Sequence, residues 1–183
     1  MTDLTDKEAE QLLKNAELIA SAHMLTETVE RMAKEITTVL AGQYPLVLCV
    51  MSSAVVFTGQ LLPLLNFPLD FDYLHPTRYN HTLQGGVIEW KVSPPDNLKG
   101  RAVLVLDDIL DEGFTLATIR QRVMEGGAKA FYSAVLADKV IGKTKPICAD
   151  FIGMSLPDRY VFGYGMDIKG LWRNLPAIFA IKE

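Results

Sequence analysis

The pattern of apolar and polar positions divides the chain into short apolar runs and longer amphipathic stretches. Short apolar runs bounded by turn residues are typical of strands buried in a sheet. Such runs occupy residues 46–51, 67–74, 101–108, 130–138, 150–156, 159–165 and 177–181. Residues 87–92 alternate apolar and polar side chains, which predicts an exposed hairpin arm.

The amphipathic stretches predict helices. Thr5 and Glu8 have the spacing of a capping box, and the apolar side chains that follow keep a helical period as far as Ile19. A second helix is predicted from about Thr26 to a stop at Gly42. Two more helices are predicted after the strand at 46–51, ending near 65, and over 115–125; residues 75–86 are polar and contain glycine, which predicts a loop.

Strands that alternate with helices favour a mostly parallel sheet with helices on its faces. We therefore expect an α/β fold with a mostly parallel central sheet flanked by helices. The length of 183 residues, of which 49% are hydrophobic, is enough for a sizeable core. No repeat or linker is visible, so one domain over residues 1–183 is predicted.

Composition and charge narrow the classes of function. The net charge is −4 with acids and bases interspersed, which argues against a nucleic-acid surface. No apolar stretch approaches membrane-spanning length, and the acidic first residues are unlike a signal peptide. Cys49 and Cys148 lie in apolar contexts, where reduced, packed thiols are expected. We expect a cytoplasmic protein with neither a nucleic-acid nor a membrane partner.

Candidate chemistry gathers in residues 105–115, VLDDILDEGFT. Asp107 and Asp108 are predicted to end the strongest strand, at the sheet edge where ligands of open α/β sheets bind. The following turn opens a helix, whose N-terminal N–H groups and dipole attract a phosphate. The residues whose N–H groups are expected to converge in this loop are Glu112, Gly113, Phe114 and Thr115.

Acids at a helix N-terminus also have an ordinary explanation, because they stabilise the helix dipole. Two adjacent acids at a strand end, with Asp111 and Glu112 in the turn, exceed what capping requires. We therefore favour a functional interpretation. The loop lacks the lysine of a triphosphate-binding loop, so a single phosphate is expected. The Glu112 side chain is expected to point to solvent, since a carboxylate aimed at a phosphate would be repulsive.

This stretch resembles the phosphoribosyl-pyrophosphate motif of type I phosphoribosyltransferases. The resemblance implies that fold, with a small hood region and a flexible lid loop, over a core of about residues 24–175. It implies that Asp107 and Asp108 face the ribose hydroxyls and that residues 111–115 hold the 5′-phosphate. An acid at position 111 resembles the hypoxanthine-guanine branch, in which Asp111 would be the general base toward the purine.

Residues 156–167, LPDRYVFGYGMD, resemble the purine-binding segment of that family. The resemblance implies that Tyr160 stacks on the base and that the Val161 backbone reads its edge. Lys139, at the family's interval before Tyr160, would donate to the 6-oxo group, because a lysine can only donate. Further implied roles concern the leaving group: Mg²⁺ would be bound by Asp167, and pyrophosphate by Arg173.

Two other segments match the family less well. Arg78 and Tyr79 stand where the family lid usually has Ser-Tyr. Ser52 and Ser53 would bind pyrophosphate, but Ser53 and Ala54 replace the usual glycine pair, whose backbone contains an uncommon cis peptide. The sequence leaves open whether this loop keeps that form.

The resemblance implies a purine salvage enzyme. Its substrates would be phosphoribosyl pyrophosphate and hypoxanthine or guanine, its cofactor Mg²⁺, and its assembly a homodimer or homotetramer. A nucleotide-binding regulator that lost efficient chemistry is the alternative, motivated by Ser53 and Ala54; an RNA-binding form of it lacks a basic face. An unrelated flavodoxin-like binding domain fits the segment 157–173 poorly. Preference among hypoxanthine, guanine and xanthine stays open.

Overall fold

The computed structural model describes residues 5–78 and 88–182, and of Arg78 only the backbone. Within these residues a six-stranded sheet has the order β4-β3-β2-β5-β6-β7, in which β4 pairs antiparallel with β3 and every other pair is parallel. This confirms the predicted mostly parallel sheet. The strands are β2 (Leu46–Val50), β3 (Asp70–Arg78), β4 (Ile88–Val92), β5 (Ala102–Leu110), β6 (Ala130–Val140) and β7 (Phe151–Pro157).

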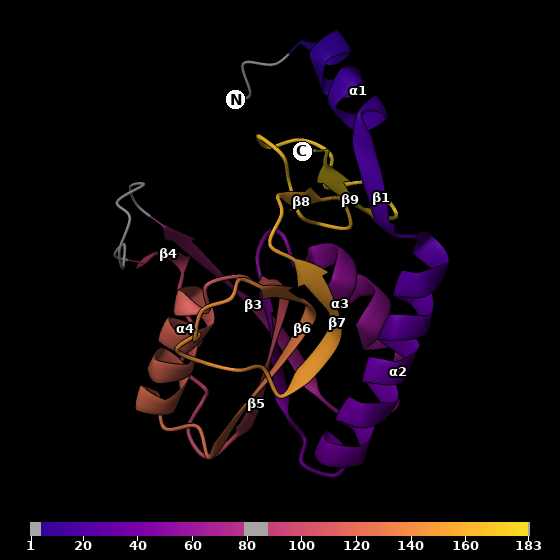
Figure 1. Cartoon of the computed structure of the whole chain (residues 1–183). Coiled ribbons are helices and arrows are strands. Elements are labelled where there is room, and N and C mark those ends of the chain that lie inside the picture. Colours follow the sequence, from indigo (N-terminus) through magenta and orange to yellow (C-terminus); the bar gives the residue numbers. More distant parts are fainter. Residues whose placement is uncertain (1–4, 79–87, 183) are drawn as a thin grey trace.

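Helices cover both faces of this sheet (Figure 1). On one face lie α2 (Ala22–Leu40), α3 (Val55–Leu61) and the 3-10 turn η1 (Leu62–Leu64), and on the other lies α4 (Phe114–Glu125). Successive side chains of β5 point to opposite faces, so Leu104 and Leu106 pack with α2 and α3, whereas Val103 and Val105 pack with α4. A strand buried on both faces therefore needs the continuous apolar run that the sequence shows.

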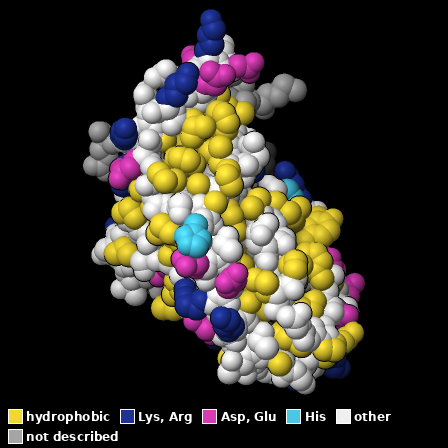
Figure 2. Space-filling view, turned by 90° about the vertical axis from the view of Figure 1, so that its right-hand side faces the viewer, with side chains coloured by type: hydrophobic (Ala, Val, Ile, Leu, Met, Phe, Trp, Pro, Cys, Tyr) yellow, Lys and Arg dark blue, Asp and Glu magenta, His cyan; other side chains and the backbone are white. Residues whose placement is uncertain are grey.

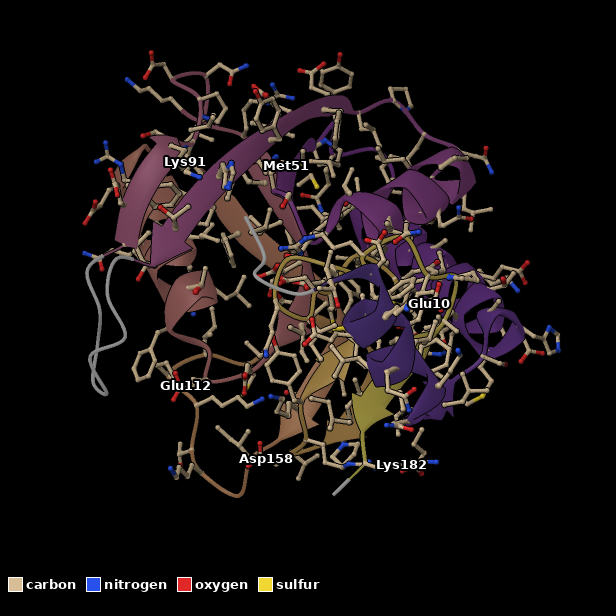
Figure 3. The ribbon with its side chains drawn as sticks, turned by 90° about the horizontal axis from the view of Figure 1, so that it is seen from above. Glu10, Met51, Lys91, Glu112, Asp158 and Lys182 are labelled. Atoms are coloured by element: carbon tan, nitrogen blue, oxygen red, sulfur yellow. The ribbon has the colours of Figure 1, made fainter. Side chains whose placement is uncertain are left out.

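A separate, antiparallel sheet forms a small hood above the carboxyl ends of the parallel strands (Figure 1). Its strands, in spatial order, are β1 (Ala16–Ala20), β9 (Ile178–Ile181) and β8 (Val161–Phe162). The N-terminal helix α1 (Asp6–Lys14) precedes β1 and is nearest the viewer in Figure 3, which looks down on the hood. Residues near both ends of the described chain therefore form the hood, which lies over the carboxyl ends of the parallel strands.

Apolar side chains form a band on the face that carries β1 and α2 (Figure 2). Leu18 of β1 and Met24 of α2 are among the exposed apolar residues, at 54% and 49%. Among the described helices, none is long and apolar enough to cross a membrane.

Several element boundaries differ from prediction because tertiary pairing overrides local pattern. The Thr5 capping box is confirmed, but the helical period does not continue to Ile19, since residues 16–20 pair with β9. The second helix begins at Ala22, capped by Ser21, rather than near Thr26.

The prediction of a loop over residues 75–86 was wrong for its first residues. Residues 75–78 continue β3, because β4 pairs with them as far as Arg78 and Ile88. Residues 79–86 of that loop lie outside the described residues. The strand that carries the acids was also predicted to be too short. It runs on to Leu110, since β6 pairs alongside it to that point, so Asp107 and Asp108 lie within β5 rather than at its end.

Candidate functional site

A cavity of about 670 Å³ lies where the carboxyl ends of the parallel strands face the hood. It is the place where open α/β sheets bind ligands. Its lining comes from the hood, from β2, β3, β5 and β6, from the loops after β2 and β5, and from the start of α4. The lining residues are Val50, Met51, Ser53, Pro76, Asp107, Asp108, Ile109, Leu110, Asp111, Gly113, Thr115, Leu116, Lys139, Tyr160, Val161, Met166, Asp167 and Arg173.

Two adjacent carboxyl groups form the floor of the cavity. Asp107 and Asp108 are only 7% and 6% exposed, and the Asp108 N–H donates to Asp107 Oδ1 at 3.0 Å. Burial raises the pKa of Asp108 above its ordinary value, because loss of water disfavours the charged form. Hydrogen bonds with Asp107 and Ser53 act in the opposite direction. A buried acid pair of this kind is adapted to a ligand that brings positive charge or hydroxyl donors.

The predicted phosphate loop leads from β5 into α4. Gly113 is the N-cap of α4 and has a φ of 85°, a left-handed conformation that glycine adopts without steric cost. Gly113 and Thr115 line the cavity at the N-terminus of α4, the end of a helix that favours negative charge. Glu112 is exposed and is absent from the lining, in agreement with the prediction that its side chain points to solvent. Phe114 is also exposed, at 47%.

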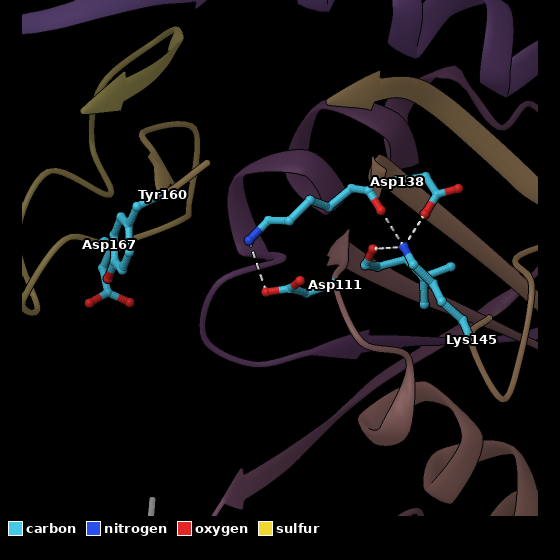
Figure 4. A network of polar contacts seen from close by, with 7 residues as sticks. Asp111, Asp138, Lys145, Tyr160 and Asp167 are labelled. Atoms are coloured by element: carbon cyan, nitrogen blue, oxygen red, sulfur yellow. Dashed lines mark hydrogen bonds and ion pairs between the residues drawn. The ribbon is translucent and has the colours of Figure 1, made fainter. Parts of the chain in front are cut away.

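The predicted base and the predicted purine donor lie together. Lys139 Nζ donates to Asp111 Oδ2 at 3.0 Å, and the Lys139 side chain is only 13% exposed (Figure 4). Asp111 directly follows β5, and Lys139 lies near the end of β6, one residue beyond the last pair that β5 makes with β6. One acceptor and one donor are therefore presented side by side to the cavity.

Across the cavity from Asp111 lie Tyr160 and Asp167, which belong to the hood (Figure 4). Tyr160 is 52% exposed, so its ring offers a free face, and its hydroxyl donates to the Asp167 carbonyl at 3.2 Å. Partial burial, followed by the Asp167 charge, raises the pKa of the Tyr160 phenol, which keeps the phenol neutral. Val161 follows Tyr160 and is buried in β8.

The structure also brings Asp167 and Arg173 together. Arg173 Nη2 lies 2.6 Å from Asp167 Oδ1, while the Gly170 N–H donates to Asp167 Oδ2 at 2.7 Å. Arg173 Nη1 donates to the Gly165 carbonyl at 2.7 Å. The carboxylate and the guanidinium thus form one polar cluster at the cavity wall.

The loop after β2 has the unusual form that the resemblance implies. The Met51–Ser52 peptide is cis, although Ser53 and Ala54 stand in place of the glycine pair. Ser53 lines the cavity, whereas Ser52 is exposed and is absent from the lining.

Three site features escaped sequence reasoning. Gly165, with a φ of 103°, packs so closely on the Ser53 carbonyl that a Cβ would collide with it; the glycines on either side of Tyr164 were the available signal. Trp172 Nε1 donates to the Ala9 carbonyl at 3.0 Å, joining the hood to α1. Lys145 is largely buried and donates to the Leu110 and Lys139 carbonyls, and no local pattern marks it.

Other predictions have different outcomes. Tyr79 of the predicted lid lies outside the described residues, and Arg78 ends β3 with only its backbone described. Cys49 is buried as expected, but Cys148 is exposed, so the expectation of a packed thiol at Cys148 was wrong. Cys148 lies in the irregular segment between β6 and β7, where an apolar sequence does not ensure burial.

The donor set fits a magnesium ion held largely by substrate. Among the described residues, no three His, Cys, Asp or Glu side chains gather as a metal cluster. Asp167 nevertheless presents a carboxylate to the cavity. Because Mg²⁺ is usually bound through one or two carboxylates together with substrate phosphate oxygens and water, one such carboxylate is sufficient.

Comparison with known proteins agrees with this geometry. The family model described as "Phosphoribosyl transferase domain" matches residues 15–169. A hypoxanthine-guanine phosphoribosyltransferase of Streptococcus pneumoniae is 31% identical over 167 residues, which cover 91% of this chain and 93% of the relative. A hypoxanthine-guanine-xanthine phosphoribosyltransferase of Tritrichomonas foetus is 32% identical over 160 residues, 87% of each chain.

Solved structures show the same fold. A hypoxanthine-guanine phosphoribosyltransferase of Bacillus anthracis superposes with a TM-score of 0.85 at 27% identity, covering 91% of this chain and 98% of the other. A hypoxanthine phosphoribosyltransferase of Staphylococcus aureus superposes with a TM-score of 0.87 at 22% identity, covering 94% and 95%. The chain therefore belongs to the phosphoribosyltransferase family and, within it, is a relative of the hypoxanthine-guanine phosphoribosyltransferases.

Proposed function

We propose that this protein transfers the phosphoribosyl group of phosphoribosyl pyrophosphate to hypoxanthine or guanine in purine salvage, within one phosphoribosyltransferase domain. The observation that carries the proposal is the pairing of Asp111 with Lys139 at 3.0 Å in a cavity that also holds a buried acid pair. The curated relatives whose names state this activity are matched over nearly their whole length.

The reaction joins purine N9 to C1′ of the ribose while the bond from C1′ to the pyrophosphate oxygen breaks. The sugar carbon becomes cation-like as pyrophosphate leaves, and buried carboxylates at this point favour the developing charge. Asp107 and Asp108 are assigned this role, together with hydrogen bonds to the ribose hydroxyls. The N–H groups of residues 112–115 and the Thr115 hydroxyl hold the 5′-phosphate at the start of α4.

The purine lies between the strand ends and the hood. Asp111 accepts the ring proton that the base loses, and Lys139 donates to the 6-oxo group. The exposed face of Tyr160 stacks on the base, and the Val161 backbone reads its edge. The base must separate Asp111 from Lys139 to bind, so each group exchanges its partner for a purine atom.

The leaving group is assigned to the remaining cationic and polar side chains. Arg173 and the loop of Ser52 and Ser53 bind pyrophosphate. Arg78 and Tyr79 contribute from the lid. The Asp167 carboxylate would hold Mg²⁺, because a hard divalent cation prefers oxygen ligands, and the ion would supply positive charge next to pyrophosphate.

The wider setting follows from the same assignment. We expect a cytoplasmic enzyme that associates into a homodimer or homotetramer. Phe71 and Tyr73, exposed at 50% and 44% on β3, support self-association, since aromatic side chains are enriched at interfaces. Light scattering after size-exclusion chromatography measures the assembly, and a monomer at micromolar concentration would contradict this expectation.

Pyrophosphate release with phosphoribosyl pyrophosphate, Mg²⁺ and either hypoxanthine or guanine tests the proposed activity. We expect turnover with at least one of these bases. Nucleotide binding by calorimetry without turnover, followed by activity on replacing Ser53 and Ala54 with glycine, would instead support the regulator. The named enzymatic relatives do not favour that alternative.

A further inference from the structure

Lys145 lies in the segment between β6 and β7, and its side chain is only 11% exposed. Its ammonium group donates to three acceptors: the Leu110 carbonyl at 2.6 Å, the Lys139 carbonyl at 2.7 Å and Asp138 Oδ1 at 2.5 Å (Figure 4). A lysine has three N–H donors, so the group is fully satisfied. A buried charge with such a complete set of partners holds those partners in one arrangement.

The three acceptors lie at the bases of the two predicted purine contacts. Leu110 immediately precedes Asp111, and the second carbonyl belongs to Lys139 itself. The pairing of β5 with β6 ends at Leu110 and Asp138, so beyond them this ladder no longer joins the two strands, although Lys139 still pairs with Leu156 of β7. Lys145 supplies the cross-strand connection at this point.

The Asp138 carboxylate neutralises the positive charge of the Lys145 ammonium group. An unpaired ammonium at this depth would be costly, and removing one partner of a buried pair leaves the other uncompensated. Asp138 is 29% exposed, so it keeps contact with solvent while it neutralises Lys145. The two carbonyl bonds, rather than the ion pair, reach the strand ends that carry Asp111 and Lys139.

The same segment also packs against Gly113 of the phosphate loop, and the atoms nearest to Gly113 are carbons. A Cβ added at Gly113 would lie 3.3 Å from Pro146 Cδ, 3.4 Å from Lys145 Cβ and 3.5 Å from Ile147 Cγ2. A methionine at position 145 retains the Cβ and the length of the side chain but has no donors. Replacement by methionine therefore separates the two contacts: it removes the hydrogen bonds to the purine side and leaves the packing on the phosphate side.

We propose that Lys145 is a positioning residue for the purine half of the site, setting the separation of the Asp111 carboxylate from the Lys139 ammonium. The proposal rests on the proposed function, because it assigns the purine to these two groups. Lys145 touches no substrate in this account; it acts through the two backbone carbonyls. Misplacement of reacting groups by about 1 Å can cost about a hundredfold in rate.

The test compares Lys145→Met with the wild type in steady-state assays at 25 °C. We expect kcat/KM for hypoxanthine to fall about tenfold to a hundredfold, while KM for phosphoribosyl pyrophosphate changes by less than about threefold because the packing on Gly113 is retained. Lys129→Met is the matched control, since Lys129 is exposed and precedes the opposite end of β6. The control should leave all constants unchanged.

A second variant covers the case in which Lys145→Met does not fold. Asp138→Asn removes the charge partner and leaves both carbonyl acceptors, so we expect a smaller fall in kcat/KM for hypoxanthine, with KM for phosphoribosyl pyrophosphate again preserved. A lower melting temperature with unchanged kinetic constants in the folded variants would overturn the positioning role. Equal losses toward both substrates would also overturn it. Absence of turnover in the wild type would instead refute the proposed function.

Discussion

The sheet and the hood supply opposite walls of the cavity, and they hold their polar side chains by different means. On the sheet wall, Asp107 and Asp108 belong to a strand paired on both sides and are almost fully buried. On the hood wall, Tyr160 is half exposed. The hood loop that follows it contains non-glycine residues with positive φ, namely Tyr164, Lys169 and Trp172.

This difference shows where each wall obtains its rigidity. The sheet wall is fixed by the ladder between β5 and β6 and by apolar side chains packed on both faces. The hood wall depends on a few specific polar contacts, such as Asp167 with Arg173 and Trp172 with Ala9. We infer that the sheet wall is the more rigid of the two and that the hood wall is the more adjustable.

The largest predicted effect comes from the chemistry on the sheet wall. Asp111→Asn keeps the size of the side chain but removes the proton acceptor, so kcat should fall about a hundredfold or more. Asp96→Asn is the matched control, since Asp96 is exposed and outside the cavity lining. Initial rates of pyrophosphate release measure both variants. A fall of less than threefold for Asp111→Asn would remove Asp111 from the role of base.

The next effect concerns the loop that joins this wall to α4. Gly113→Ala places a Cβ in a left-handed conformation, which costs roughly 1–2 kcal/mol, and against Pro146 at 3.3 Å. We expect KM for phosphoribosyl pyrophosphate to rise about tenfold and the melting temperature to fall. Gly142→Ala is the control: it has a similar φ of 67° but no atom within 4 Å of the added Cβ. An unchanged KM would show that the loop does not hold the 5′-phosphate.

Burial of acids on the sheet wall predicts a pH effect on stability. Because the native pKa of Asp108 is raised, the folded state binds the proton more tightly than the unfolded state. Binding of this proton stabilises the folded state fully at acidic pH. That stabilisation of the fold is lost as pH rises through the raised pKa of Asp108. Asp108→Asn should therefore raise the melting temperature of the ligand-free protein at pH 7 by a few degrees, since about 1 kcal/mol corresponds to roughly 2–4 °C.

The advantage of Asp108→Asn should shrink as pH is lowered, because protonation of wild-type Asp108 removes the buried charge. Thermal unfolding followed by circular dichroism across a range of pH measures it. A variant less stable than the wild type at pH 7 would mean that hydrogen bonds to the ionised carboxylate stabilise the fold by more than burial of its charge costs.

The smallest effect concerns the hood. Trp172→Phe removes the hydrogen bond to the Ala9 carbonyl and keeps an aromatic ring. We expect a loss of about 0.5–1.5 kcal/mol in the free energy of unfolding, measured by urea titration, with kcat changed by less than about twofold. A tenfold change in kcat would show that α1 controls the hood wall more strongly than one hydrogen bond from Trp172 suggests.

The sheet wall was largely predictable from sequence, because its signals are local. A continuous apolar run predicts β5, and the acids and Gly113 that follow it indicate a ligand loop. The extension of β5 to Leu110 was missed, since it depends on pairing with β6. The pairing of Asp111 with Lys139 was not predicted as a contact, although both were assigned to the purine.

The hood was less predictable because its contacts join distant parts of the chain. Residues 16–20 have a helical spacing of apolar side chains, yet they form β1 by pairing with β9 at the other end of the chain. Lys145 shows the same limit, since its role depends on three acceptors that come together only in the fold. The likeness to a known family located Tyr160, Asp167 and Arg173 where local pattern alone did not.

Base selectivity tests the central claim, that Asp111 and Lys139 together read a 6-oxopurine. The measurement is the ratio of kcat/KM for hypoxanthine to that for adenine, in the wild type and in Lys139→Gln. We predict a preference for hypoxanthine of at least about a thousandfold in the wild type, because the lysine has no acceptor for the adenine amino group. The ratio should narrow in Lys139→Gln, whose amide can accept. Comparable use of adenine by the wild type, or an unchanged ratio in the variant, would contradict the claim.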